Sequence, residues 1–233
     1  MKKSVITTRC GKLRFKLAIF DLDGTICDTI PDLTTGINIM RGTFGFPPIT
    51  ESDVKRHINN GADLLTQRCL PGDFPKERYA EAKEIYLKAY SKCYKDKTYP
   101  YKGMSEAVER LRSAGMKTVV FSNKGDSHVR GLVNSIYPSL FDFTLGDGIY
   151  PVKPDPAGAL AIAKRFGCTA DECVFIGDSH IDMQTANNAK MYKIGVSWGY
   201  RPPELLIENG ADAIAYSPEE LASVILGETH PRL

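Results

Sequence analysis

The spacing of apolar positions changes along the chain and separates two kinds of region. Between residues 30 and 94 the apolar positions recur at helical spacing, as at Leu33, Ile37 and Met40, and no run there reads as a strand. From Gly103 onward, helical patterns alternate with short apolar and β-branched runs. Such alternation predicts a parallel sheet with helices on both of its faces.

The expected elements follow from these runs and from the Gly and Pro residues that interrupt them. Strands are expected over residues 17–20, 116–121, 143–145, 173–176, 193–196 and 213–215. Helices are expected over residues 32–44, 63–70, 76–94, 105–114, 127–135, 156–166, 182–189, 203–209 and 218–226. The first strand precedes the helical region and the other strands follow it. We therefore expect an α/β core of residues 1–27 and 101–233, with residues 28–100 inserted as a helical domain.

Composition limits the class of protein. The 233 residues fit one or two domains, and a net charge of +2 is too small to indicate a nucleic-acid or membrane partner. The basic N-terminus has no apolar core for a signal peptide, and no stretch approaches the roughly 18 apolar residues of a membrane span. The cysteines show no CxxC spacing, which argues against a zinc site and favours a reduced, cytoplasmic setting. Monomer and homodimer both remain open.

Two carboxylates, Asp21 and Asp23, directly follow the apolar run of residues 17–20, and Gly24 and Thr25 come after them. Open α/β sheets bind ligands at the carboxyl ends of their strands. If the chain loops outward after Asp21, both carboxylates reach one pocket, where one acts as nucleophile and the other as acid and base. The alternative is a pair of turn aspartates flanking Gly24, because Asp and Gly are common in turns.

Two candidates for binding phosphate lie in the α/β region. Ser122, Asn123 and Lys124 directly follow the strand expected at 116–121. A hydroxyl with free backbone N–H groups at a helix start suits a phosphate oxygen, and a helix N-cap serine is the alternative. Lys153 lies on a loop stiffened by prolines, where an ammonium group neutralises a nucleophilic carboxylate and a phosphoryl group together. A solvated surface lysine is the alternative there.

A second acidic pair follows the strand expected at residues 173–176. Asp178 and Asp182 suit Mg²⁺, which takes carboxylate oxygens and keeps several waters. The alternative is an N-cap aspartate with a second aspartate in the first helical turn, where both carboxylates interact favourably with the helix dipole. His180 lies between them as a further candidate ligand, with a solvated loop histidine as its alternative.

Each motif alone is a moderate indication of function. The joint appearance of all four, each after an expected strand and in one order, is a strong one. Over essentially its whole length the chain resembles the haloacid dehalogenase-like hydrolase superfamily. Residues 21–25 resemble its first motif, Ser122 its second, Lys153 its third, and Asp178 with Asp182 its fourth. The resemblance implies a Rossmann-like parallel sheet core with helices on both faces and an inserted α-helical cap.

The resemblance also implies a Mg²⁺-dependent phosphomonoesterase and a role for each matching residue. Asp21 attacks phosphorus and forms an aspartyl-phosphate, while Asp23 protonates the leaving oxygen and then activates water. Mg²⁺ is held by Asp21, the backbone carbonyl of Asp23, and Asp178. Asp182 orients the site or binds the metal through water. The residues expected to bind the phosphoryl group or substrate in the core are Ser122, Asn123, Lys153, Gly24 and Thr25.

Within the superfamily, the chain most resembles the phosphoglycolate phosphatase branch. The stretches that carry this resemblance are residues 20–33, 58–70 and 195–201. The expected substrate is a small phosphorylated metabolite, with 2-phosphoglycolate the leading candidate. Inorganic pyrophosphate or a nucleotide monophosphate is the runner-up. A sugar phosphomutase and a non-catalytic phosphate-binding domain are the weaker alternatives.

We expect closure of the cap to bring Asn59, Asn60 and Gly61 over the phosphoryl site. The family usually has Ile-Gly-x-Gly at residues 58–61, where this chain has two asparagines. Because Asn tolerates a positive φ better than most residues, the turn is expected to survive. His57 and Arg68 are further candidates to meet a substrate carboxylate, with an exposed helix-face charge as the alternative for Arg68.

Overall fold

A computed structural model describes residues 14–230, so Cys10 and the basic N-terminal segment lie outside the described residues. The core is a six-stranded sheet of order β5-β4-β1-β6-β7-β8, with every neighbouring pair parallel. This sheet confirms the expected α/β, Rossmann-like class. Its strands are β1 Leu17–Phe20, β4 Lys117–Gly125, β5 Phe143–Asp147, β6 Cys173–Gly177, β7 Tyr192–Val196 and β8 Ala213–Ala215.

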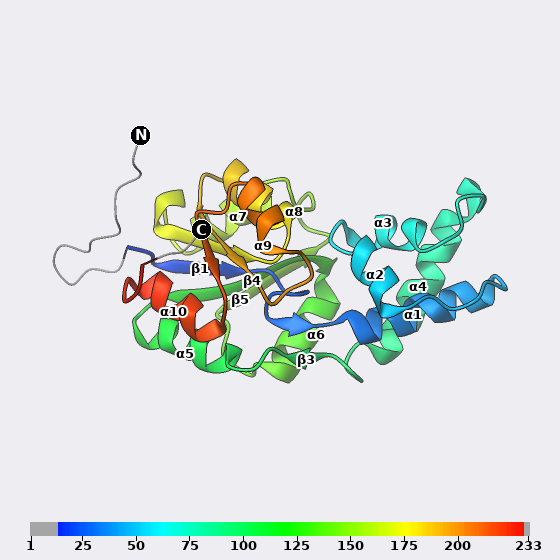
Figure 1. The fold of residues 1–233 in the computed structure, drawn as a ribbon, viewed down its shortest axis with the longest axis horizontal. Helices are drawn as coiled ribbons and strands as arrows, with labels where there is room; N and C mark the ends of the chain where they lie inside the picture. Colours follow the sequence, from blue (N-terminus) through cyan, green and yellow to red (C-terminus); the bar gives the residue numbers. More distant parts are fainter. Residues whose placement is uncertain (1–13, 231–233) are drawn as a thin grey trace.

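Helices cover both faces of the sheet (Figure 1). One face is covered by α5 (Met104–Ser113), α6 (Asp126–Ile136) and α10 (Pro218–Leu226). The other is covered by α7 (Ala157–Arg165), α8 (His180–Asn188) and α9 (Pro203–Glu208). A short 3₁₀ turn, η2 (Ala170–Glu172), precedes β6.

The central strand β1 explains why its sequence is continuously apolar. All four of its side chains are fully buried, and alternate ones enter the hydrophobic clusters on the two faces of the sheet. In register, Phe20 lies opposite Val120 of β4 and Ile176 of β6. The polar residues that follow these three positions therefore emerge at one edge of the sheet.

The segment between β1 and β4 forms a group of helices with its own hydrophobic core, which lies beyond the end of the sheet in Figure 1. We call this group the cap. Its elements are α1 (Ile30–Thr43), α2 (Glu51–His57), α3 (Gly61–Arg68), the 3₁₀ turn η1 (Lys76–Arg78) and α4 (Tyr79–Cys93). Helix α2 was not expected, because only Val54 of its seven residues is buried and no apolar period appears. Its sequence signal is the capping box of Thr50 and Asp53.

The two connections to the cap pair with each other. Strands β2 (Cys27–Asp28) and β3 (Tyr99–Pro100) form a two-stranded antiparallel sheet. Two residues are too few to show an alternating pattern, so the sequence predicted no strand at either connection. The buried Asp32 carboxylate accepts hydrogen bonds from the backbone N–H groups of Lys97 and Thr98 at 2.8–3.0 Å, which fixes the returning connection to α1.

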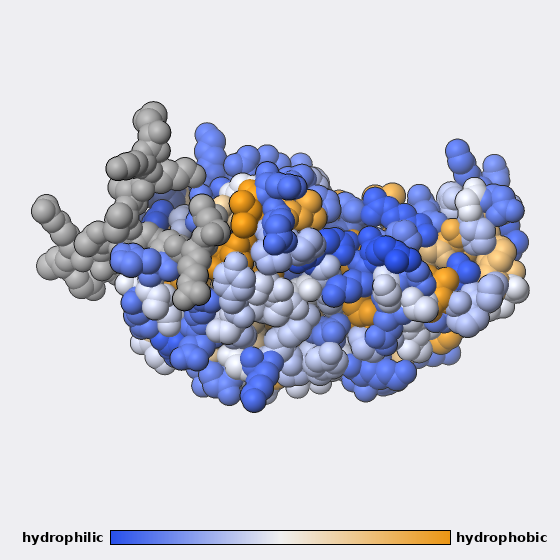
Figure 2. Space-filling model, viewed as in Figure 1, coloured by the Kyte–Doolittle hydropathy of each residue, from blue (hydrophilic) through white to orange (hydrophobic). Residues whose placement is uncertain are grey.

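The outer surface carries mainly polar side chains. Figure 2 shows that the visible face is largely hydrophilic, with apolar side chains gathered in separate areas over the core and over the cap. Among residues 14–230, no helix has both the length and the apolar character needed to cross a membrane.

Candidate active site

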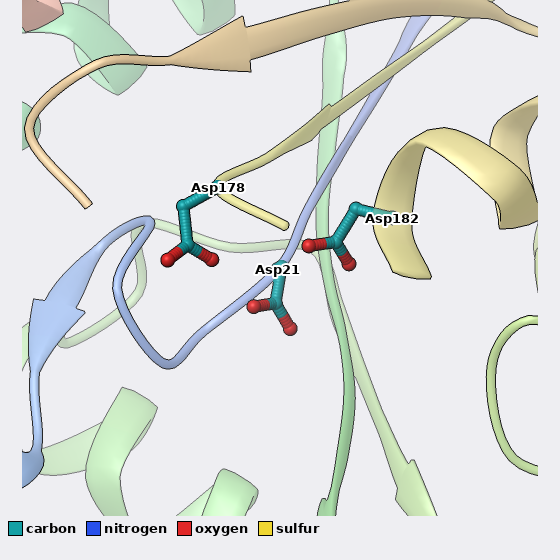
Figure 3. A group of neighbouring side chains, drawn as sticks. All are labelled: Asp21, Asp178 and Asp182. Atoms are coloured by element: carbon teal, nitrogen blue, oxygen red, sulfur yellow. The ribbon is translucent and has the colours of Figure 1, made fainter. Parts of the chain in front are cut away.

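Three carboxylates meet at the carboxyl edge of the sheet (Figure 3). Asp21 directly follows β1, Asp178 follows β6, and Asp182 lies in the first turn of α8. One oxygen from each lies within 4.8 Å of the others, and all three side chains are buried. Ser179 caps α8: its Oγ accepts from the Asp182 N–H and donates at 2.6 Å to Asp182 Oδ2. The helix start thereby fixes one of the three carboxylates.

Lys153 lies among these carboxylates. Its Nζ is 2.6 Å from both Asp21 Oδ1 and Asp182 Oδ1, and its side chain is 3% exposed. Burial alone would lower the pKa of this ammonium, but the Asp182 and Asp21 carboxylates outweigh burial and raise it. Asn123 anchors the Lys153 loop, because its side-chain amide donates to the Lys153 carbonyl and accepts from the Lys153 N–H, at 3.0 and 2.7 Å. Lys153 is therefore a fixed, charged group of the site.

The carboxylate cluster is short of positive charge. Three carboxylates facing one ammonium group leave two formal negative charges in a buried place. Burial raises the pKa of Asp21 well above its ordinary value, and burial with the nearby Asp182 raises that of Asp178 to about 7. Asp178 Oδ2 accepts from the Tyr200 N–H at 2.7 Å, whereas Asp178 Oδ1 is buried and has no partner among residues 14–230. Oxygen donors, excess negative charge and an unpartnered carboxylate oxygen all fit a hard divalent cation.

Asp23 has surroundings different from those of Asp21. Its Oδ1 accepts from Thr29 Oγ1 at 2.5 Å and lies 2.8 Å from Lys124 Nζ. Both aspartates line the same cavity. Thus two carboxylates two residues apart are held by different cations, Asp21 by Lys153 and Asp23 by Lys124.

Ser122 lies in the cavity wall, but not at a helix start as expected. Strand β4 continues through Ser122 to Gly125, paired irregularly with β5, and α6 begins only at Asp126. Ser122 Oγ accepts from the Lys124 N–H at 3.2 Å. The hydroxyl therefore comes from the end of a strand, and the helix dipole contributes nothing to the expected phosphate contact.

The cavity lies between the core and the cap. The core side is polar and holds the aspartates and lysines described above. The cap side is mainly apolar. Its lining residues from the cap are Leu33, Ile58, Asn59, Gly61, Ala62, Leu65, Tyr86, Leu87 and Tyr90.

The cap turn before α3 reaches the core through Asn59. The Asn59 carbonyl accepts from Asn123 Nδ2 at 3.2 Å, and Asn59 has a positive φ of 112°. Gly61 also lines the cavity, as expected. Asn60 is not among the lining residues, and its Oδ1 accepts instead from Arg68 at 2.9 Å. The structure therefore brings Asn59, rather than Asn60, to the substrate space.

Gly24 and Thr25 are not brought to the cavity wall. The Gly24 N–H donates to the Cys27 carbonyl and the Thr25 N–H to the Leu22 carbonyl, both within the loop. Thr25 Oγ1 is buried, and the described part of the chain offers it no partner. Gly24 has a φ of +87°, and a Cβ there would come within 2.2 Å of Asp178 Oδ2. Its place in the motif thus reflects close approach of the backbone to the Asp178 carboxylate.

The other candidates lie outside the cavity wall. Arg68 is exposed and binds Asn60 and the His57 carbonyl. His57 and His180 are half-buried, and burial lowers the pKa of each. His180 Nδ1 is buried and finds no hydrogen-bond partner within the described residues.

Sequence reasoning did not propose the lining residues Tyr86, Tyr90, His128 and Ser179 as site residues, and it named Lys124 beside Ser122 without giving it a role. Lys124 stands two residues after Ser122 in one strand, which is a usable signal once the strand is known to continue. The two tyrosines have the helical spacing of core residues, so nothing in their pattern distinguishes a cavity wall from packing.

The fold and the site together define a Rossmann-like α/β protein with a buried acidic centre and a helical cap. The sequence pattern described as Haloacid dehalogenase-like hydrolase matches residues 18–196, and the chain belongs to this family.

Similar proteins agree on the branch of the family. The phosphoglycolate phosphatase of Psychrobacter arcticus is 32% identical over 194 residues, covering 79% of this chain and 84% of the relative. Phosphoglycolate phosphatase 1 of Pseudomonas aeruginosa is 31% identical over 225 residues, covering 91% and 82%. A crystal structure from Lactobacillus delbrueckii subsp. bulgaricus, provisionally named as a phosphoglycolate phosphatase, matches with a TM-score of 0.87 at 33% identity and covers 92% of this chain and 100% of that chain. The chain is a phosphatase enzyme, as its sequence predicted.

Proposed function

We propose that the protein is a Mg²⁺-dependent phosphomonoesterase that converts 2-phosphoglycolate to glycolate and phosphate. The observation that carries the proposal is the pairing of Asp21 with Lys153 at the polar end of a cavity that Asp23 also lines. The relatives named phosphoglycolate phosphatase support the choice of substrate.

In the first half-reaction, an Asp21 oxygen attacks phosphorus and the bond from phosphorus to the leaving oxygen breaks. Asp23 gives its proton to that oxygen, so the alcohol leaves neutral. Lys153 and Ser122 bind the phosphoryl oxygens, which supplies the positioning and charge stabilisation on which phosphoryl transfer depends. Asn123 keeps Lys153 in place through its backbone contacts.

In the second half-reaction, water attacks the phosphorus of the aspartyl-phosphate. Asp23 takes the proton of this water, and the Asp21 carboxylate leaves as phosphate is released. One carboxylate thus serves as acid and then as base, which restores the enzyme at the end of the cycle.

The metal site in this proposal consists of Asp21, Asp178 and the backbone carbonyl of Asp23. When bound, Mg²⁺ supplies positive charge that offsets the negative charge of the phosphoryl group. Asp182 orients the site, because both of its oxygens are already engaged by Lys153 and Ser179. Asp178 Oδ1, buried and unpartnered, is the atom most available to a cation.

We further propose that residues 28–100 act as a lid on the core. The two connections at β2 and β3 are the hinge, and the contact between Asn59 and Asn123 belongs to the closed state. A small anionic substrate offers few atoms to the core, so closure supplies the remaining contacts and excludes water. The free thiols among the described cysteines support a reducing, cytoplasmic setting.

The test is a substrate panel that measures release of inorganic phosphate by the purified protein, with Mg²⁺ and with excess EDTA. The panel holds 2-phosphoglycolate, pyrophosphate, nucleotide monophosphates and sugar phosphates. We expect the highest kcat/KM for 2-phosphoglycolate, loss of activity in EDTA, and no activity in Asp21→Asn. If pyrophosphate or a nucleotide exceeds 2-phosphoglycolate by about tenfold, or about 1.4 kcal/mol in transition-state stabilisation, the substrate assignment fails and the phosphatase chemistry stands.

A further inference from the structure

Lys124 is a second buried lysine of the cavity, separate from Lys153. Its side chain is 7% exposed, and its Nζ lies 2.8 Å from Asp23 Oδ1. The same Nζ donates at 2.9 Å to the hydroxyl of Tyr90 on cap helix α4 and lies 4.8 Å from the centre of that ring. Lys124 therefore connects the proposed acid–base carboxylate of the core with the cap.

The ammonium group of Lys124 has one donor left for a ligand. A lysine ammonium carries three N–H donors. Asp23 and Tyr90 account for two, and no other acceptor for Lys124 Nζ is found among residues 14–230. Lys124 itself lines the cavity, so the remaining donor is at the substrate space.

No other cation of the cavity wall is available for the far end of a substrate. Among the described lining residues the lysines are Lys124 and Lys153, and there is no arginine. Lys153 is held by Asp21 and Asp182 at the phosphoryl end. His128 is also present, but burial and the charge of Lys124 lower its pKa, which favours its neutral form. The cap side of the wall is apolar apart from the tyrosines and the Asn59–Gly61 turn.

The reaction fixes where the leaving group must lie. Asp23 can protonate the leaving oxygen only from hydrogen-bond distance, so the carbon attached to that oxygen lies next to Asp23. Lys124 Nζ is itself 2.8 Å from Asp23. A substituent one carbon further along the leaving group therefore falls within reach of Lys124 and of the Tyr90 hydroxyl.

We propose that Lys124 is a specificity-determining residue that binds a carboxylate on the leaving group, with the Tyr90 hydroxyl beside it. The substrate class is then the phosphate esters of short 2-hydroxy acids, whose carboxylate lies one carbon from the ester oxygen. The proposal rests on the phosphatase reaction proposed above and adds the residue that selects the leaving group. A charge-assisted contact in a mainly apolar wall discriminates strongly, because a carboxylate without a partner is costly to bury there.

The experiment compares two substrates that differ only at this substituent. 2-Phosphoglycolate carries the carboxylate, and 2-hydroxyethyl phosphate carries a neutral hydroxymethyl group in its place. We expect the wild type to prefer 2-phosphoglycolate in kcat/KM by at least about tenfold, the value of one 1.4 kcal/mol contact. Lys124→Met should reduce this ratio by at least about tenfold, and Tyr90→Phe should reduce it less.

The ratio separates selection from positioning. Loss of the Lys124 contact to Asp23 slows both substrates, and this common effect cancels in the ratio. The matched control is Lys88→Met, an exposed lysine on α4 that is not in the cavity wall, and it should leave the ratio unchanged. If Lys124→Met slows both substrates equally, Lys124 only positions Asp23 and the proposal is wrong.

Two further readings keep the outcomes distinct. In the wild type, glycolate should inhibit at concentrations at least about tenfold below those of ethylene glycol, a test that does not depend on a variant folding. Equal inhibition, or equal wild-type turnover of the two esters, overturns the role of Lys124 and leaves the phosphatase intact. If the wild type with Mg²⁺ hydrolyses neither ester nor 4-nitrophenyl phosphate, the proposed function fails as well.

Discussion

Asp21 and Asp23 show how neighbouring residues of one type acquire different environments. Asp21 is buried beside Lys153 and two further carboxylates, whereas Asp23 accepts from Thr29 and Lys124. Separating the environments of two carboxylates is how an enzyme gives one of them the role of nucleophile and the other that of acid and base.

The first prediction compares the two aspartates. Asp21→Asn should abolish turnover, because Asp182, the other carboxylate beside Lys153, already accepts from Lys153 and Ser179 through its two oxygens. Asp23→Asn should keep the fold and lose about 10²–10⁴ in kcat, the range for removal of a general acid–base group. Steady-state kinetics on samples with wild-type melting curves measure both. Near-normal turnover in either variant contradicts the mechanism.

The second prediction concerns His128, whose ring lies 5.1 Å from the Tyr90 and Tyr94 rings and 2.9 Å from Ser91 Oγ at the cap–core contact. Burial and Lys124 lower its pKa, although Asp23 partly opposes this. A lowered pKa means that the folded state binds fewer protons, so the contribution is present above the unfolded value of about 6.5 and is lost as pH falls.

Denaturant unfolding measures this contribution. Between about pH 7.5 and about pH 5.5, the free energy of unfolding should fall less in His128→Asn than in the wild type. An equal fall in both proteins would show that His128 is not the titrating group at this contact.

The residue scale also shows what sequence could reveal. An apolar run that the sequence identifies ends just before each of Asp21, Ser122 and Asp178. The meeting of these three residues at one edge of the sheet was therefore predictable. Lys153 was recognised by its place in the order of motifs. The hydrogen bond from Asn123 to the Asn59 carbonyl was not predictable, because it depends on the conformation of the cap turn and on how that turn meets Asn123.

At the scale of elements, length decided which ones the sequence revealed. The central strands and the core helices have enough apolar positions to show their period. Helix α2 has one buried residue, and β2 and β3 have two residues each, so tertiary contacts rather than pattern define them. Strand β4 extends past its apolar run because backbone pairing with β5 resumes at Gly125.

The third prediction concerns α2 and the core. Arg201, in the loop after β7, donates to the Lys55 carbonyl at 2.7 Å and the Ile58 carbonyl at 3.1 Å. Carbonyls at the C-terminal end of a helix have no N–H partner within the helix, so they are natural acceptors for a cationic side chain. Arg201→Gln should weaken cap closure and lower kcat/KM for 2-phosphoglycolate by about tenfold, since such charged contacts contribute about 1.5 kcal/mol or more.

The control for this prediction is Arg68→Gln, which removes an exposed arginine whose contacts stay within the cap. Its kcat/KM should change little. An activated aryl phosphate, whose good leaving group depends less on closure, should also be affected less by Arg201→Gln. Equal kinetics of Arg201→Gln and the wild type on 2-phosphoglycolate would mean that Arg201 does not control closure.

At the scale of the whole molecule, the sheet and the cap divide the work. Strands β1, β4 and β6 are in register, so the charged and polar groups of the site lie together at their carboxyl ends. The cap covers these groups with mainly apolar side chains. In the proposed function, the core therefore carries the chemistry and the inserted cap selects the substrate. If the proposed metal site is right, the excess of buried negative charge in the core makes the stability of the folded protein depend on a bound cation.

The fourth prediction follows from that dependence. Mg²⁺ at about 100 times its dissociation constant should stabilise the folded protein by about 2.7 kcal/mol, which raises the melting temperature by about 5–10 °C for a chain of this size. Asp178→Asn should lose most of this response. Asp73→Asn, which changes an exposed aspartate of the cap, should keep it. An unchanged melting temperature in the wild type at high Mg²⁺ contradicts the proposed metal site.

The most direct test of the central claim is to locate the covalent intermediate. Asp23→Asn retains the nucleophile but lacks the base for the second half-reaction. It also lacks the acid for the first, so the substrate is 4-nitrophenyl phosphate, whose good leaving group needs no protonation. Mixed with this ester and Mg²⁺ and quenched in acid, the variant should accumulate phosphoryl enzyme. Peptide mass spectrometry should then find one phosphoryl group on Asp21, and none when Asp21 is also changed to Asn. A phosphoryl group on another residue, or release of 4-nitrophenolate by this variant with no phosphoryl enzyme formed, would contradict the account.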